Sequence, residues 1–203
     1  ILEKDGARII RLYAKTSSYE IKDGTVTIDC YAFAECKELQ SVTIPEGVLT
    51  IGEWAFAYCD NLETVVIPNT VKEMKRNAFW KCVNLKSINI PNALIEISEN
   101  VFNGCTNLIS VVIPQGVTKI GASAFCSCTS LTNIVIPESV TYIGYDAFND
   151  CTGLTSITIP SSVTEIEYSA FSGCTGLKEI TVSSENLLED VKLPEGVKVI
   201  IAS

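Results

Sequence analysis

The sequence contains no histidine among its 203 residues. Histidine is the side chain that most often acts as a general base near neutral pH, and it is the commonest metal ligand. Without it the chain lacks the usual activator of a nucleophilic cysteine or serine. P-loop, dinucleotide-binding and G-x-S-x-G patterns are missing as well. We therefore expect neither an enzyme nor a cofactor-dependent protein.

Positive charge is also scarce. The chain has 15 Lys and Arg against 24 Asp and Glu, a net charge of −9. This balance argues against nucleic acid as a partner, because nucleic-acid-binding proteins present a basic stripe to the phosphates. No apolar run approaches the roughly 20 residues of a membrane span, so we expect no membrane insertion within this segment. No signal-peptide pattern opens the chain at Ile1, so we expect any signal or anchor to lie outside this segment.

What the sequence does contain is a 23-residue period. Phenylalanine recurs at this spacing without a slip, each followed by a cysteine three residues later and a leucine six residues later. The phenylalanines are Phe33, Phe56, Phe79, Phe102, Phe125, Phe148 and Phe171. A fixed period of this length predicts a solenoid of stacked coils. Such folds offer long, shallow surfaces that suit binding better than chemistry.

One repeat shows how a coil is built. Val42 and Ile44 are spaced as inward residues of a strand, and Pro45 ends the strand ladder because it has no N–H. Two more apolar positions follow, at Val48 and Ile51. The segment Ala55-Phe56-x-x-Cys59 is then expected to form a short helical turn.

These residues carry a family resemblance. The string I-P-x-x-V-x-x-I-G-x-x-A-F-x-x-C-x-x-L-x-x-V-x-I-P resembles the BspA-like class of leucine-rich repeats over residues 19–182, and residues 140–160 are its closest copy. The resemblance implies a right-handed leucine-rich repeat solenoid of the α/β horseshoe class. A parallel β-sheet would form the concave face, with turns and short helical or 3-10 segments on the convex face. The resemblance also implies a bacterial surface or secreted protein used for adhesion or protein binding.

The two ends depart from the repeat. We expect residues 1–20 to be an N-terminal cap or the remnant of a preceding segment, and residues 21–182 to form an array of about seven coils. Residues 183–203 are expected to form an irregular C-terminal coil and cap. Within this last part, residues 193–197 repeat residues 44–48 almost verbatim, but Pro194 comes 34 residues after Pro160 rather than 23.

The nine cysteines have several possible roles. Seven lie on the repeat, whereas Cys30 and Cys126 lie off it. An odd number cannot pair completely within one chain, and cysteine is itself a good small buried hydrophobe. We therefore expect a column of buried thiols. Disulfides between coils, a zinc site nucleated by Cys126-x-Cys128 and a catalytic cysteine are the alternatives.

Candidate contact residues are those that the repeat does not assign to the core. On the outward side of the main strands an apolar strip is predicted, comprising Val66, Ile109, Val112 and Val135. Two aromatic groups occupy outward positions: Trp54, Tyr58 and Trp80, and further along Tyr142, Tyr145 and Tyr168. Tryptophan and tyrosine are enriched in binding hot spots. The alternatives are β-propensity on a solvated sheet and aromatic rings that only shield coil edges.

The sequence thus predicts a non-catalytic binding or adhesion module of a bacterial cell-surface or secreted protein. Its partner would be a protein, such as host extracellular matrix or another surface protein, or a glycan. The alternative is a passive structural stalk or spacer within a larger surface protein.

Overall fold

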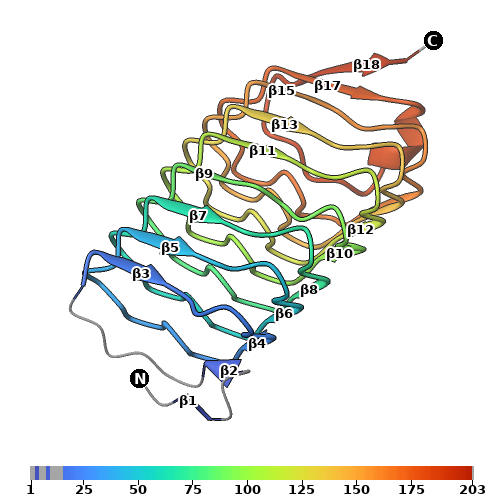
Figure 1. The fold of residues 1–203 in the computed structure, drawn as a ribbon. Helices are drawn as coiled ribbons and strands as arrows, with labels where there is room; N and C mark the ends of the chain where they lie inside the picture. Colours follow the sequence, from blue (N-terminus) through green and yellow to red (C-terminus); the bar gives the residue numbers. More distant parts are fainter. Residues whose placement is uncertain (1–2, 5–7, 10–15, 203) are drawn as a thin grey trace.

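The computed structural model describes residues 3–4, 8–9 and 16–202, which form a stack of coils carrying two rows of short strands (Figure 1). We number the coils by their phenylalanine, from coil 1 with Phe33 to coil 7 with Phe171. The first strand row runs the length of the stack and consists of a six-stranded and a three-stranded sheet. Its strands are β3 (Ser18–Glu20), β5 (Ser41–Thr43), β7 (Thr64–Val66), β9 (Ser87–Ile88), β11 (Ser110–Val112), β13 (Asn133–Val135), β15 (Ser156–Thr158), β17 (Glu179–Val182) and β18 (Lys198–Ile201).

The second strand row lies on another side of the coils and was not anticipated as strands from the sequence. It also falls into two sheets, separated between β8 and β10. Its strands are β2 (Arg8–Ile9), β4 (Thr27–Ile28), β6 (Thr50–Ile51), β8 (Glu73–Met74), β10 (Glu96–Ile97), β12 (Lys119–Ile120), β14 (Tyr142–Ile143) and β16 (Glu165–Ile166), with β1 (Glu3–Lys4) antiparallel to β2. The other pairs in this row are parallel. Within the array they advance by one repeat, as in Ile51↔Met74 and Ile120↔Ile143.

The core is continuous along the stack. Every phenylalanine of the repeat is fully buried, and neighbouring rings stack with centroid distances between 4.8 and 5.9 Å. Tyr19 contacts the first ring, Phe33, edge-on at 5.5 Å. Inward Val, Ile and Leu of both strand rows complete each layer. The core therefore has no boundary between coils, as expected of a repeat array.

The prediction of short helices on the remaining side of the coils is wrong. Within the described residues the one helix is the 3-10 helix η1 (Glu185–Leu188), and the segments around each phenylalanine are turns. In coil 2 the amides alternate: Ala57 N–H bonds locally to Trp54 C=O at 3.1 Å, whereas Phe56 N–H bonds to Ala78 C=O of the next coil at 2.8 Å. The bonds between coils take the donors that a helix would use internally. We call this side the turn wall.

The C-terminal part changes the repeat length. β18 pairs with β17 in parallel, with Ile180 opposite Val199, a step of 19 rather than 23 residues. The motif at residues 193–197 thus leads into a strand of the first row, although residues 44–48, its counterpart, lead into the second row. Helix η1 is capped by Ser184, whose side chain accepts a hydrogen bond from Asn186 N–H.

Candidate binding surfaces

The apolar strip predicted on the first strand row is exposed. Val66 in β7, Val112 in β11 and Val135 in β13 are 67%, 72% and 57% exposed, and Ile109 precedes β11 with 52% exposed. Val112 and Val135 are direct cross-strand partners. Val66 stands apart from them because the intervening coil carries Asn89 at this position.

Asn89 interrupts the strip and leaves a shallow depression. Its side-chain oxygen accepts a hydrogen bond from Ile67 N–H at 3.0 Å, and its amide group donates to Ile67 C=O. The side chain thus makes the backbone hydrogen bonds that a neighbouring strand would otherwise make, as asparagine side chains often do. Next to it, β9 and β11 share the single pair Ser87↔Ser110. The resulting hollow of about 520 Å³ has Val66 and Val112 among its lining residues.

The first aromatic group forms one cluster on the turn wall, and it includes a residue that the sequence reasoning missed. Trp80 contacts Trp54 and Tyr58 edge-on, with centroid distances of 5.0 and 4.7 Å. Tyr31 stacks on Trp54 at 6.0 Å and extends the cluster to coil 1. Lys81 Nζ lies 4.7 Å from the Trp80 ring centroid and 5.7 Å from that of Tyr58. Tyr31 lies one period before Trp54, and that spacing was the signal available in the sequence.

Three of these aromatic residues adopt an unusual backbone conformation. Tyr31, Trp54 and Tyr58 have φ values of 61°, 59° and 59°. Coils 1–6 have a left-handed residue at two points of the turn wall, and coil 7 has one at the second point alone. Glu35 and Lys81 occupy the second point in coils 1 and 3, and, apart from the three aromatic residues, the other positions hold small or polar residues. These residues are Asn77, Asn100, Ser123 and Asp146 at the first point, and Gly104, Ser127, Asp150 and Gly173 at the second. Asn, Asp and Gly tolerate this conformation far better than bulky side chains.

The second aromatic group is dispersed. Tyr142 lies in β14, where its hydroxyl donates to Glu167 Oε1 at 3.0 Å and Lys119 Nζ lies 4.7 Å from its ring centroid. Desolvation and the nearby Glu167 carboxylate raise the pKa of Tyr142. Tyr145 and Tyr168 are 53% and 57% exposed. Among the described residues no ring contact joins these three tyrosines, so they do not form a cluster like that of coils 1–3.

The repeat cysteines form a buried column of thiols. From coil 2 onward each Sγ donates a hydrogen bond to the phenylalanine carbonyl of the preceding coil, as Cys105 does to Phe79 C=O at 3.2 Å. Burial raises the pKa of these thiols, to about 12 for Cys105 and Cys174. Cys30 is an exposed free thiol and Cys126 a half-buried one. No group of ligands suited to a metal occurs within the part of the chain that the structure describes.

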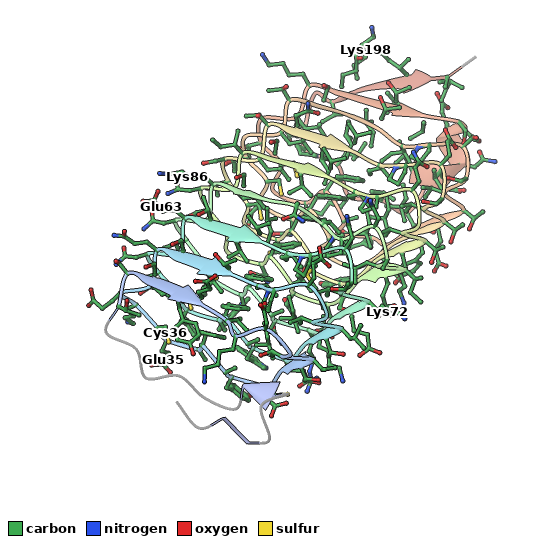
Figure 2. All side chains as sticks on the ribbon, viewed as in Figure 1. Glu35, Cys36, Glu63, Lys72, Lys86 and Lys198 are labelled. Atoms are coloured by element: carbon green, nitrogen blue, oxygen red, sulfur yellow. The ribbon has the colours of Figure 1, made fainter. Side chains whose placement is uncertain are left out.

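Exposed ion pairs follow the repeat as well. Lys86 Nζ lies 2.7 Å from Glu63 Oε2, and the two residues lie on neighbouring coils at the edge of the first strand row (Figure 2). Arg76 and Glu53 form a second pair at 3.1 Å. Pairs this exposed contribute about 0–1 kcal/mol each to the free energy of unfolding, so these surface charges do not determine the fold.

The profile of the BspA type leucine rich repeat region, in six copies, matches residues 12–132 and 96–200. The chain belongs to the BspA-type leucine-rich repeat family. A search of curated protein sequences finds no match. In the described residues no helix is long and apolar enough to cross a membrane.

Solved bacterial structures share this fold. A leucine-rich repeat protein of T. pallidum is 30% identical with a TM-score of 0.76, covering 82% of this chain and 80% of its own. A leucine-rich cell surface protein of Faecalibacterium prausnitzii is 27% identical with a TM-score of 0.51 over 89% of this chain. One from Bacteroides ovatus is 24% identical with a TM-score of 0.63 over 92% of this chain. The chain spans 64% and 63% of the length of these last two proteins.

Proposed function

We propose that this chain is a non-catalytic binding module of a bacterial cell-surface or secreted protein, and that it contacts a protein partner through Tyr31, Trp54, Tyr58 and Trp80. Membership of the BspA-type family supports a binding role. The F. prausnitzii relative, which is described as a cell surface protein, supports the location. The absence of histidine supports a role without catalysis.

The observation that carries the proposal is the backbone conformation of the cluster. A bulky L-residue in the left-handed region costs about 1–2 kcal/mol relative to the right-handed one. Tyr31, Trp54 and Tyr58 accept this cost at positions where coils 3–6 have Asn, Ser, Asp, Lys or Gly. The core does not require these rings, because Phe33 and Phe56 already fill the layers beneath. Strain retained without a packing need points to a functional role.

The ring geometry favours a protein over a glycan. Sugars stack on open, flat aromatic faces, but each of these rings already has one face engaged. Tyr31 covers Trp54 at an interplanar angle of 9°, and Lys81 Nζ lies over both Trp80 and Tyr58. The arrangement presents ring edges and one ammonium, and Glu35 and Asp60, the latter paired with Lys37 at 3.5 Å, are close by in the sequence. A rigid aromatic centre with a charged rim is the composition of a protein hot spot.

The remaining candidates rank below this cluster. The strip of Val66, Ile109, Val112 and Val135 is exposed but made of small β-branched residues that suit a solvated sheet equally well. Tyr145 and Tyr168 are exposed but lie outside any ring cluster. They provide matched aromatic positions for comparison.

The test is binding to a panel of immobilised extracellular-matrix proteins, bacterial surface proteins and glycans. The variant is Trp54→Asn with Trp80→Ala, and the control is Tyr145→Ala with Tyr168→Ala. Asparagine suits the left-handed position, so we expect the fold to persist by circular dichroism. One hot-spot residue is worth about 2 kcal/mol or more, so loss of even one of the two should weaken a protein complex by at least about 30-fold.

Equal loss in both double variants would remove the cluster from consideration. Binding to glycans alone would replace the protein partner by a carbohydrate. A wild-type chain that binds nothing on the panel would favour the passive spacer.

A further inference from the structure

The second strand row opens at one junction, between coils 3 and 4. Elsewhere a backbone amide of each coil donates to the carbonyl one period earlier. These rungs are Leu49→Val26, Lys72→Leu49, Thr118→Ile95, Thr141→Thr118 and Thr164→Thr141, at 2.8–2.9 Å. Among the described residues no corresponding bond joins Ile95 N–H to Lys72 C=O. Ile95 N–H and Lys72 C=O therefore lack the partner that the other coils provide.

The neighbouring rung explains why the junction opens. Lys75 N–H, Gly121 N–H and Glu167 N–H each bond to the carbonyl 24 residues earlier, at 2.8–3.0 Å. At Ser98 the hydroxyl bonds to Met74 C=O instead, at 2.7 Å. Bulk alone is not the cause, because lysine and glutamate keep the backbone bond. The serine hydroxyl competes with its own amide for the acceptor, as short polar side chains do.

A second contact between these coils is also missing. Thr70, Ser139 and Ser162 each donate a hydroxyl hydrogen bond to the carbonyl 22 residues earlier. Coil 4 has Ala93 at this position and cannot do so, and the same holds for coils 2 and 5, which have Gly47 and Gly116. Coils 3 and 4 are also farther apart in the core, since the distance of 5.9 Å between the Phe79 and Phe102 ring centroids is the widest in the phenylalanine stack. The missing rung at Ile95, the hydroxyl bond of Ser98 and the widest ring spacing thus coincide at one junction.

The opening is a cavity of about 610 Å³. We call it the seam; it is lined by Lys72, Glu73, Met74, Lys75, Ala93, Leu94, Ile95, Glu96 and Ser98. Met74 and Leu94 are only 2% exposed and form an apolar floor, whereas Ile95 is 69% exposed at the rim. Lys75 Nζ lies 3.9 Å from Glu73 Oε2, and Lys72 makes no ion pair with any described residue. Figure 2 places Lys72 at the outer edge of this row.

We propose that the seam binds an extended peptide segment of a partner polypeptide, one peptide unit of which enters the opening between Lys72 and Ile95. One peptide unit supplies both missing partners: its N–H donates to Lys72 C=O and its C=O accepts from Ile95 N–H. An aliphatic side chain of the segment packs on Met74, Leu94 and Ile95. A carboxylate on the segment pairs with Lys72, since Glu73 and Glu96 repel it from the other rim positions.

A peptide fits the seam better than a small molecule. The unpaired acceptor and donor lie directly before β8 and β10, and an extended backbone satisfies such groups by pairing with them. The apolar floor gives the alternate side chains of a strand a place to pack. This site is separate from the aromatic cluster and does not depend on the proposed function.

The probe is a fluorescein-labelled synthetic copy of residues 46–53 of this chain, Glu-Gly-Val-Leu-Thr-Ile-Gly-Glu. In the fold this segment contains β6, which already pairs with the other edge of β8. Fluorescence anisotropy should show saturable binding to the full chain. N-methylation of the leucine that corresponds to Leu49 removes the central donor, and it should weaken binding at least about tenfold, which equals about 1.4 kcal/mol.

A variant of the chain provides the second arm. Ser98→Gly restores the residue found at Gly52, Gly121 and Gly144, and it should close the seam and weaken peptide binding at least about tenfold. Ser110→Gly, the same change on the first row, should leave binding unchanged. Hydrogen exchange should slow at Ile95 on peptide binding.

Four results would each overturn the proposal. They are equal affinity for the methylated peptide, retained affinity in Ser98→Gly, protection confined to the end coils, and no saturable binding at millimolar peptide.

Discussion

Replacing Phe125 with alanine removes one ring from the middle of the phenylalanine stack. Phe125 is fully buried in coil 5 and stacks on Phe102 at 5.4 Å and on Phe148 at 5.5 Å. Its C=O also accepts the thiol hydrogen bond of Cys151. The substitution therefore leaves a cavity that both neighbouring coils share, and it cuts the stack into two parts.

The cost follows from these contacts. A buried Phe→Ala change destabilises by about 3–5 kcal/mol. Each lost aromatic pair adds about 0.5–1.5 kcal/mol beyond buried area. The sum is about 4–8 kcal/mol, which is comparable with the whole stability of a typical domain, about 5–15 kcal/mol. Because stability in an array depends on nearest-neighbour coupling, we expect the halves to unfold separately.

Two probes distinguish separate from joint unfolding. The chain has only two tryptophans, Trp54 in coil 2 and Trp80 in coil 3. Urea denaturation followed by far-ultraviolet circular dichroism should show an early transition that tryptophan fluorescence does not share. Val112→Ala, at a side chain that is 72% exposed, is the control and should cost less than about 0.5 kcal/mol. A cost below about 2 kcal/mol with coincident probes would refute the shared-cavity reasoning.

Two further predictions concern the thiols. Burial raises the pKa of Cys105 to about 12 from an ordinary value of about 9.0, so as the pH rises the thiol of the unfolded chain loses its proton first. The contribution of Cys105 to stability should therefore be full below about pH 9 and fall as the pH rises toward 12. Urea midpoints under reducing conditions should show this decline, and Cys105→Ala should make it shallower; an unchanged slope would contradict the burial argument. In the native chain Cys30 should react fast with a disulfide reagent, Cys126 slowly and the buried column only after denaturation, and Cys30→Ser should abolish the fast phase. A fast phase that survives this substitution would show that another thiol is open.

The sequence was sufficient to predict the core because its periodic rows are packing rows. Phe56, Cys59 and Leu62 recur in phase, and all three are fully buried. Val42 and its equivalents alternate with outward residues, so their strands could be placed. The helical reading of residues 55–59 failed for a physical reason. Its small and apolar residues at i, i+1 and i+4 also suit turns whose amides bond to the next coil.

The candidate surfaces could be predicted only in part. Trp54, Tyr58 and Trp80 were identifiable as outward aromatics, but their contact with Tyr31 depends on how far the turn wall rotates between coils. The seam was invisible because it arises from bonds that are not formed. Ser98 is an ordinary substitution in the sequence, and only the bond pattern shows that it coincides with an open junction.

The departures from the repeat can be sorted by what they cost. Val101 in place of alanine stays buried within the core, so it exchanges one packing residue for another. Tyr31, Trp54 and Tyr58 place bulky side chains in a strained backbone, and Ser98 lacks the backbone bond to the preceding coil. Neither set improves the core, and both lie in coils 1–4. We infer that recognition is concentrated in this half of the array, whereas coils 5–7 chiefly extend and stiffen it.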